Sequence, residues 1–274
     1  MPETTLRLEA VSQVFHPGTP NEVWALDGVD LELARGSFTV VLGTNGSGKS
    51  SLLGAIAGSL APARGRIYLD GREVTHWTEQ RRAHLIGRVF QSPFTGTASD
   101  LSVAENLMLA GRRGGQRWLR PALGPDRRRV IREKVARLGM ELEDRLDTPI
   151  GLLSGGQRQA LTVLMATMVR PTLLLLDEHT AALDPRSAEL VIRLTQEVIT
   201  AGGLTTLMVT HSLAQAVQLG DRVLIMHRGR LVHDIAELRR QRLAEDDLLQ
   251  LFDQLRWADR LDDSAAAMLR RAYV

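Results

Sequence analysis

A glycine-rich loop with one lysine is the clearest chemical feature of this chain. It reads GTNGSGKS, from Gly43 to Ser50, and fits the pattern G-x-x-x-x-G-K-[ST]. Glycines let the backbone turn its N–H groups around phosphate oxygens at the start of a helix, whose dipole favours anions. Lys49 can reach the β- and γ-phosphates, and Ser50 can offer its hydroxyl to Mg²⁺. A tight glycine turn between a strand and a helix, with no ligand, is the alternative.

Lys49 also stands out among the basic residues. Only two of the 34 lysines and arginines are lysines, Lys49 and Lys134. A compact ammonium group fits between phosphate oxygens where a planar guanidinium does not. The use of lysine at this point therefore favours a phosphate site.

Two adjacent acids follow four leucines. Leu173 to Leu176 predict a buried strand that ends in Asp177 and Glu178. Open α/β sheets bind ligands at the carboxyl ends of their strands. Adjacent acids at that edge can divide the work: Asp177 orients hydrated Mg²⁺ and Glu178 polarises the attacking water. Solvated acids at a strand end are the alternative.

Gln91 and His211 each follow a short apolar stretch. The neutral amide of Gln91 can contact Mg²⁺ or the water and withdraw without leaving a charge behind, which suits a residue that reports nucleotide state. His211 can donate a hydrogen bond to the γ-phosphate and hold Glu178. A surface glutamine and a structural histidine are the alternatives.

A second anion site is predicted at LSGGQ, Leu153 to Gln157. Ser154, Gly155 and Gly156 open a helix, so a hydroxyl, backbone N–H groups and the helix dipole coincide. One phosphate chain cannot easily fill this site and the first loop in the same subunit. We therefore expect a head-to-tail pair with a second copy or a homologous ATPase subunit, which closes on two ATP and opens after hydrolysis.

Strands and helices must position these residues. Phe38 to Leu42 predicts a buried strand that enters the glycine-rich loop Gly43–Ser50, which we call the phosphate loop. Ser51 to Ala57 has helical spacing. Further strands are predicted at Leu6–Val11, Asp30–Ala34, Arg66–Leu69, Leu173–Asp177, Thr205–Val209 and Val223–Met226. The middle, about 92–170, lacks clear strands and is predicted to be helical throughout. The pattern indicates an α/β core with a parallel sheet and an inserted helical subdomain.

The last 39 residues, 236–274, are charged and predicted to be helical. One apolar face could be formed there by Leu248, Leu249, Phe252, Leu255 and Trp257. We expect this face to dock on the protein's own core or on a second copy; a membrane surface is the alternative.

The composition limits the classes of protein to which this chain can belong. The 274 residues are 44% hydrophobic and 24% charged, as is ordinary for a soluble globular protein. No run approaches the roughly 18 apolar residues needed to span a bilayer. The N-terminus has neither a basic start nor an apolar stretch, so we expect no secretion signal. The absence of cysteine excludes disulfides and permits a cytosolic home.

Over about Leu6 to Ile235, the chain resembles the ATP-binding-cassette ATPases, because all their diagnostic motifs occur in order. The resemblance implies a P-loop nucleotide-binding domain with a RecA-like parallel-sheet core, an antiparallel β subdomain and an inserted helical subdomain. It divides the chain into an ATPase domain over 1–235, with the helical subdomain at about 92–170, and a C-terminal helical extension over 236–274.

The resemblance also implies roles for residues. Catalysis would depend on Glu178, His211 and Gln91, and Mg²⁺ binding on Ser50, Gln91 and Asp177. Phe15 would stack on adenine, with Trp24 as the rival and core packing as the alternative for either. The residues expected to bind ATP are Phe15, Gly43, Thr44, Asn45, Gly46, Ser47, Gly48, Lys49, Ser50, Ser51, Ser154, Gly155, Gly156, Gln157 and Asp184.

Two positions depart from the family pattern. His179 stands where proline is usual. The resemblance makes Ala181–Asp184 the D-loop of the family, and this loop begins with alanine where serine is frequent. Neither change removes a catalytic group. The stretch from LLSGGQ to LDP is similar to ATPases of tryptophan/tyrosine-type importers, which implies a membrane permease, an extracytoplasmic solute-binding protein and a place on the cytoplasmic side of the inner membrane.

Other functions stay open. Nothing in the motifs sets the direction of transport, so an export ATPase is an alternative. A soluble ATPase acting on nucleic acid or ribosomes usually has two cassettes or a long coiled coil, so no nucleic acid is expected. A run of arginines is either a solvated face or a contact with a permease or lipid headgroups: Arg112, Arg113, Arg117, Arg120, Arg127, Arg128 and Arg129.

Overall fold

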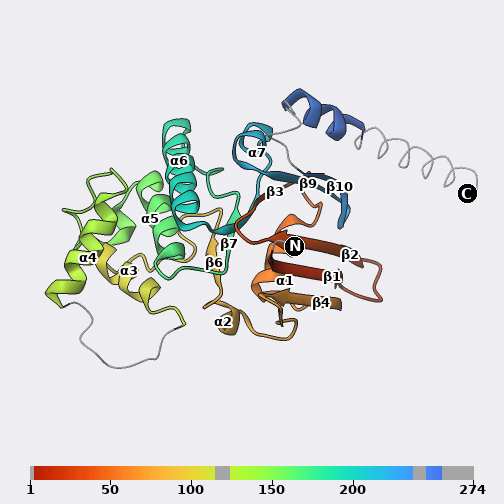
Figure 1. Ribbon diagram of the computed structural model, residues 1–274, viewed down its shortest axis with the longest axis horizontal. Helices are drawn as coiled ribbons and strands as arrows, with labels where there is room; N and C mark the ends of the chain where they lie inside the picture. Colours follow the sequence, from red (N-terminus) through yellow and green to blue (C-terminus); the bar gives the residue numbers. More distant parts are fainter. Residues whose placement is uncertain (1–2, 115–123, 237–244, 255–274) are drawn as a thin grey trace, which may run out of the picture.

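Two β-sheets enclose one helix. The computed structural model describes residues 3–114, 124–236 and 245–254. Helix α1 (Lys49–Ala57) contributes its apolar side chains to one core that also receives residues from both sheets. Figure 1 shows α1 between the two sheets.

The larger sheet has six strands in the order β10-β9-β3-β8-β7-β6. Its strands are β3 (Phe38–Leu42), β6 (Ile86–Val89), β7 (Leu173–Asp177), β8 (Thr205–Val209), β9 (Arg222–His227) and β10 (Arg230–Ala236). All pairs are parallel except β9–β10, which is antiparallel. Because the strands β3, β7 and β8 run in one direction, their carboxyl ends meet at the same edge.

The smaller sheet has four antiparallel strands in the order β2-β1-β4-β5. They are β1 (Thr4–Phe15), β2 (Val23–Ala34), β4 (Arg64–Leu69) and β5 (Arg72–Glu73). The β1–β2 hairpin ends in Phe15 and Val23, which pair with each other. That end of the hairpin therefore carries two apolar side chains on one face.

Most of the remaining helices pack into a second core on the other face of the large sheet. They are α3 (Val103–Gly111), α4 (Pro125–Ala136), α5 (Gly155–Thr167), α6 (Pro185–Gly202) and α7 (Leu213–Leu219), with the short η1 (Ile150–Leu152). The short α2 (Glu79–Arg82) instead contacts α1, where Arg82 donates to the carbonyl oxygens of Ala55 and Ile56. Figure 1 shows α3, α4 and α5 grouped on the side away from the small sheet. A further helix over 245–254 buries Leu248 in this core.

The predicted fold class is confirmed, and three predicted strands, β3, β7 and β8, have the predicted bounds. The prediction of helix throughout 92–170 is wrong for 92–101 and 137–149, which are loops and turns. Leu138, Leu142 and Leu146 are all buried four residues apart, which imitates a helical stripe. Gly139 and Glu141 instead have positive φ angles of 63° and 55°, so the chain turns between them.

Several strands were missed or predicted too short, among them β1, β2, β5, β6 and β10. The observed β1 and β2 extend well beyond Leu6–Val11 and Asp30–Ala34, because bulges interrupt the alternation on which the prediction depended. Strand β10 was not predicted; it lies at an edge, alternates between exposed and half-buried residues, and lacks an apolar run.

The docking prediction for the C-terminal apolar face is confirmed for Leu248, which packs in the protein's own core with Leu251 and Phe252 against it. Leu255 and Trp257 lie outside the described residues. Within the described ranges, no helix combines the length and the apolar character needed to cross a membrane.

Candidate functional site

A cavity of about 1370 Å³ lies at the carboxyl edge of the large sheet. The phosphate loop, Gln91, Asp177, Glu178 and His211 all line it. These residues come from segments that follow β3, β6, β7 and β8, four strands of the same sheet. The structure thus brings together the chemically distinctive residues that the sequence analysis selected from distant parts of the chain.

The phosphate loop joins β3 to α1, and its glycines are required by close packing. Gly48 has a φ angle of 106°, and a Cβ there would lie 2.2 Å from the carbonyl oxygen of Ala25. A Cβ on Gly43 would lie 2.5 Å from the carbonyl oxygen of Met226. No larger residue fits at either position, so the loop keeps its N–H groups at the N-terminal end of α1, the end that attracts anions.

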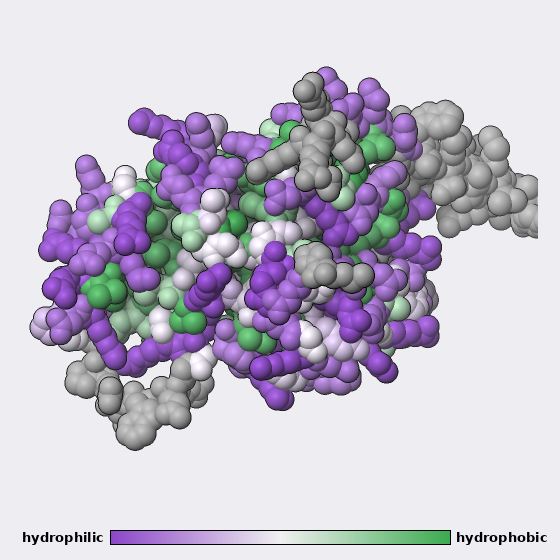
Figure 2. Space-filling model, in the orientation of Figure 1, coloured by the Kyte–Doolittle hydropathy of each residue, from purple (hydrophilic) through white to green (hydrophobic). Residues whose placement is uncertain are grey.

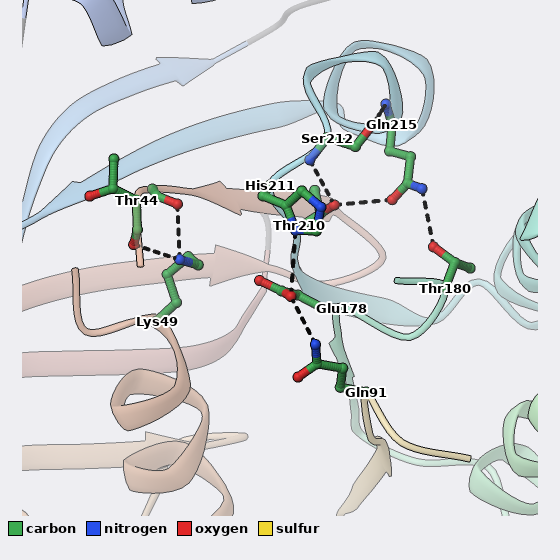
Figure 3. Close-up of polar contacts among 10 residues, drawn as sticks. Thr44, Lys49, Gln91, Glu178, Thr180, Thr210, His211, Ser212 and Gln215 are labelled. Carbon is green, nitrogen blue, oxygen red and sulfur yellow. Dashed lines mark hydrogen bonds and ion pairs between the residues drawn. The ribbon is translucent and has the colours of Figure 1, made fainter. Parts of the chain in front are cut away.

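Lys49 is held against this loop. Its Nζ donates hydrogen bonds to the carbonyl oxygens of Gly43, at 2.9 Å, and Thr44, at 2.8 Å (Figure 3). Burial lowers the pKa of Lys49, while the nearby carboxylates of Glu178 and Asp177 oppose that shift. The side chain therefore places a positive charge in the wall of the cavity, next to the phosphate loop.

Asp177 is the last residue of β7 and is largely buried. Its Oδ2 lies 3.4 Å from a guanidinium nitrogen of Arg88, on the neighbouring strand β6. Burial raises the pKa of Asp177, and the charge of Arg88 opposes this rise. A carboxylate in such a place gains from a further cation nearby.

Glu178 faces two polar side chains from other loops. Its Oε2 lies 3.4 Å from Nε2 of Gln91 and 3.4 Å from Nδ1 of His211 (Figure 3). Its backbone has a φ angle of 43°, which is rare for a residue with a Cβ, and its N–H donates to the carbonyl oxygen of Val209 at 2.9 Å. The side chain consequently turns out of the strand direction and into the cavity.

The donor set fits Mg²⁺. Ser50, Gln91 and Asp177 line the cavity and supply a hydroxyl, an amide and a carboxylate oxygen. Nowhere in the described part of the chain do three or more His, Cys, Asp or Glu residues cluster as a metal cage. Mg²⁺ commonly binds through one or two carboxylates together with substrate phosphates and water, so a cage is not needed.

The cavity has an apolar end. Phe15, Val23 and Ala25 line it, together with Leu213, Leu249 and Phe252. Trp24, the rival of Phe15, does not line it; its Nε1 donates to Glu22 at 2.9 Å and its ring lies under Arg64. Side chains alternate along a strand, so Trp24 faces away from Val23.

The second predicted anion site lies elsewhere. Ser154 caps α5: its Oγ accepts from the N–H of Gln157 at 3.2 Å, and its own N–H donates to Oε1 of Gln157. Asp184 caps α6 in the same way, accepting from the N–H of Ser187 at 3.1 Å. Neither residue lines the cavity, so within one chain these helix starts are not brought to the phosphate loop.

The departure at position 179 is accommodated inside the protein. His179 is buried, and its Nε2 lies 3.3 Å from Oγ1 of Thr195 on α6. Burial lowers the pKa of His179 to about 4, so the ring is neutral near neutral pH. The histidine thus joins the end of β7 to α6 without adding a charge beside Glu178.

Several residues at the site were not predicted. Leu249 and Phe252 were assigned to the C-terminal apolar face, and no feature of their spacing indicates that they reach the cavity. Thr180, Thr210 and Gln215, which bond to one another behind Glu178 and His211, were also missed. Threonine and glutamine carry no distinctive signal in a single sequence, because both are common on surfaces.

Comparison with known proteins agrees with this geometry. A family model described as ABC transporter matches residues 26–181. The chain is 38% identical over 250 residues to the tyrosine transport ATP-binding protein of Clostridioides difficile (strain R20291), covering 90% of this chain and 98% of that protein. It is 35% identical over 237 residues to the lipoprotein-releasing system ATP-binding protein LolD 1 of Caulobacter vibrioides, covering 85% and 96%.

A solved structure has the same fold. The ATP-binding cassette MJ0796, described as a dimer in a post-hydrolysis state bound to ADP and Pi, is similar with a TM-score of 0.72 and 26% sequence identity. The similarity covers 84% of this chain and 98% of that chain.

Proposed function

Because the chain belongs to the ABC transporter family and is one of its ATPases, we propose that it powers a bacterial importer of a small organic solute such as an amino acid. The observation that carries the proposal is the 38% identity to a tyrosine transport ATP-binding protein over almost the whole of that protein. The proposal divides the chain into an ATPase domain over 1–235, with a helical subdomain at about 92–170, and a C-terminal extension over 236–274.

The cavity supports a mechanism for hydrolysis. Water attacks the γ-phosphorus, Glu178 accepts its proton, and the bond to the bridging oxygen breaks so that ADP leaves with the electron pair. His211 holds the carboxylate of Glu178, and Lys49 stabilises charge on the phosphates. Ser50, Gln91 and Asp177 would hold Mg²⁺, which would supply positive charge to offset that of the phosphates. Phe15 supplies an aromatic face for adenine.

A second copy of the chain completes the site in this proposal. Ser154–Gln157 and Asp184 lie off the cavity of their own chain. Leu152 directly precedes LSGGQ (Leu153–Gln157), the signature motif of the family, and is 72% exposed, which suits a surface that another chain covers. The dimeric form of the similar cassette MJ0796 supports a head-to-tail pair with each ATP held between the phosphate loop of one chain and the signature motif of the other.

A smaller cavity supports contact with a permease. It has a volume of about 490 Å³ and lies between α3, α5 and β6, with Phe90, Leu109 and Met165 among its lining. Leu109 is 53% exposed, and Phe94 in the adjoining loop is 64% exposed. Most of the face seen in Figure 2 is polar, with smaller hydrophobic areas between the charged groups. We assign the groove to a short cytoplasmic helix of the permease, which would hold this chain at the membrane.

The arginine run gives little support to nucleic-acid binding. Arg113 is half-buried and donates to the carbonyl oxygen of Val169 at 2.8 Å, and Arg128 pairs with Asp147. Arg117 and Arg120 lie outside the described residues. Export remains the alternative that a relative favours, since the similar LolD 1 belongs to a lipoprotein-releasing system.

Affinity purification from native membranes tests the proposal. The Glu178→Gln chain, loaded with ATP, is expected to retain a multi-span permease, accompanied by an extracytoplasmic solute-binding protein. Leu109→Glu should remove the permease without weakening ATP binding, because it places a charge in the apolar groove. Val130→Glu, at another exposed apolar residue, is the control and should retain the permease. Recovery of ribosomal proteins or nucleic acid in place of a permease would contradict transport while leaving the ATPase assignment intact.

A further inference from the structure

One glutamine joins the segments that carry Glu178 and His211. Gln215 lies on α7, behind the cavity. Its Nε2 donates to Oγ1 of Thr180 at 3.1 Å, and its Oε1 accepts from Oγ1 of Thr210 at 3.1 Å (Figure 3). Thr180 is two residues after Glu178, and Thr210 directly precedes His211. A single amide therefore links the chain beyond β7 to the chain beyond β8.

The two residues that Gln215 links indirectly need such support. His211 has a side chain that is 64% exposed, so packing does not fix its position. Glu178 has a positive φ angle, a conformation that surrounding structure must maintain. Both contacts of Glu178 Oε2, to His211 and to Gln91, are 3.4 Å long, near the limit of a hydrogen bond. A small shift of either loop would lose them.

The hydrogen bonds of the Gln215 side chain are independent of those that cap the N-terminus of α7. That helix is capped by Ser212, whose Oγ accepts from the backbone N–H of Gln215 at 3.3 Å. The cap uses the backbone N–H of residue 215, so it does not depend on the glutamine side chain. Thr210 Oγ1 also accepts from the N–H of Ser212 at 3.1 Å. Among the described residues, the side-chain amide forms hydrogen bonds to Thr180 and Thr210 alone.

We propose that Gln215 is a positioning residue for ATP hydrolysis, which sets the distance between Glu178 and His211 through Thr180 and Thr210. The inference rests on the role proposed above for Glu178. Thr180 and Thr210 are buried, so the bridge is shielded from competing water. Gln215 does not line the cavity and has no direct contact with the phosphate loop among the hydrogen bonds described. Its influence should therefore appear in kcat and not in the binding of ATP.

Removing the bridge without shortening the side chain tests this role. Gln215→Met should lower kcat about tenfold or more, because a displacement of about 1 Å can cost about 100-fold. The Kd for ATP should stay within about twofold, since the phosphate loop is unchanged. Gln218→Met, an exposed glutamine on the same helix, is the matched control and should retain the wild-type kcat.

A second pair of variants separates positioning from general damage to the fold. Thr180→Val removes the hydroxyl at nearly constant shape and should reproduce the loss in kcat, whereas Thr180→Ser keeps the hydroxyl and should retain activity. Combining Gln215→Met with Thr180→Val should cost little more than either change alone, because both break the same bond.

Three results would overturn the inference: a kcat for Gln215→Met equal to that of Gln218→Met, a parallel loss of ATP affinity, or fully additive effects of Gln215→Met and Thr180→Val. Measurement of Tm for each variant shows whether the fold is intact at the assay temperature. If Glu178→Gln retains activity, the proposed base is wrong. If Glu178→Gln is inactive and Gln215→Met is normal, only the positioning role is wrong.

Discussion

Replacing Glu178 by glutamine is expected to reduce kcat for ATP hydrolysis by about 1000-fold, within the range that a general base contributes. An amide cannot accept the proton of the attacking water, yet it keeps the shape and the hydrogen-bonding capacity of the side chain. ATP should therefore still bind, and the chain should accumulate as a closed dimer with ATP trapped in it. Phosphate release measures the first effect and sedimentation velocity with and without ATP measures the second.

Glu189→Gln is the control for this change, because Glu189 is an exposed glutamate on α6. It should hydrolyse ATP at the wild-type rate and form no long-lived dimer. Full activity of Glu178→Gln would show that Glu178 is not the base. Asp177 and His211, which line the same cavity, would then be the candidates for that role.

Replacing Lys49 by alanine should act at an earlier step. The ammonium group lies within the phosphate loop, and each of its charge-assisted hydrogen bonds to phosphate is worth about 1.5–3 kcal/mol. Loss of one such bond weakens ATP binding roughly tenfold to 100-fold. Binding of a fluorescent ATP analogue or calorimetry measures the change, and no ATP-dependent dimer should form.

The only other lysine provides the control. Lys134, on α4, does not line the cavity, and Lys134→Ala should bind ATP with wild-type affinity. A Lys49→Ala chain that binds ATP normally would contradict the phosphate role of the loop. A large fall in Tm for Lys49→Ala would instead show that its bonds to Gly43 and Thr44 hold the loop together.

The fold was predictable where each element depends on its own residues. Strands β3, β7 and β8 are mostly apolar and are buried on both faces, so five residues suffice to define each one. Strand β10 depends on its partner β9, and the loop at 137–149 depends on burying three leucines without a helix. Neither tertiary dependence is visible in local periodicity.

The site was predictable for a similar reason. The phosphate loop and the acid pair are contiguous in sequence, because each performs its chemistry through backbone or adjacent groups. Gln215 lies 35 positions from Thr180 and 5 positions from Thr210 along the chain. No local sequence pattern therefore predicts the bridge between them. Leu249 and Phe252 reach the cavity only because the helix over 245–254 docks beside it.

Each ATP is proposed to be shared between two chains, and mixing two inactive variants tests this arrangement directly. Lys49→Ala damages the phosphate loop and leaves the signature motif intact, whereas Ser154→Arg fills the start of α5 and leaves the phosphate loop intact. Each variant alone should be inactive, because every site that two copies of it could form would contain one damaged half.

A mixed pair should regain one complete site. Equal amounts of the two variants are expected to show about a quarter of the wild-type rate, since half of randomly formed pairs are mixed and each has one intact site of two. No recovery on mixing, from two folded variants that exchange partners, would contradict the shared site. Full activity of Ser154→Arg alone would contradict it as well.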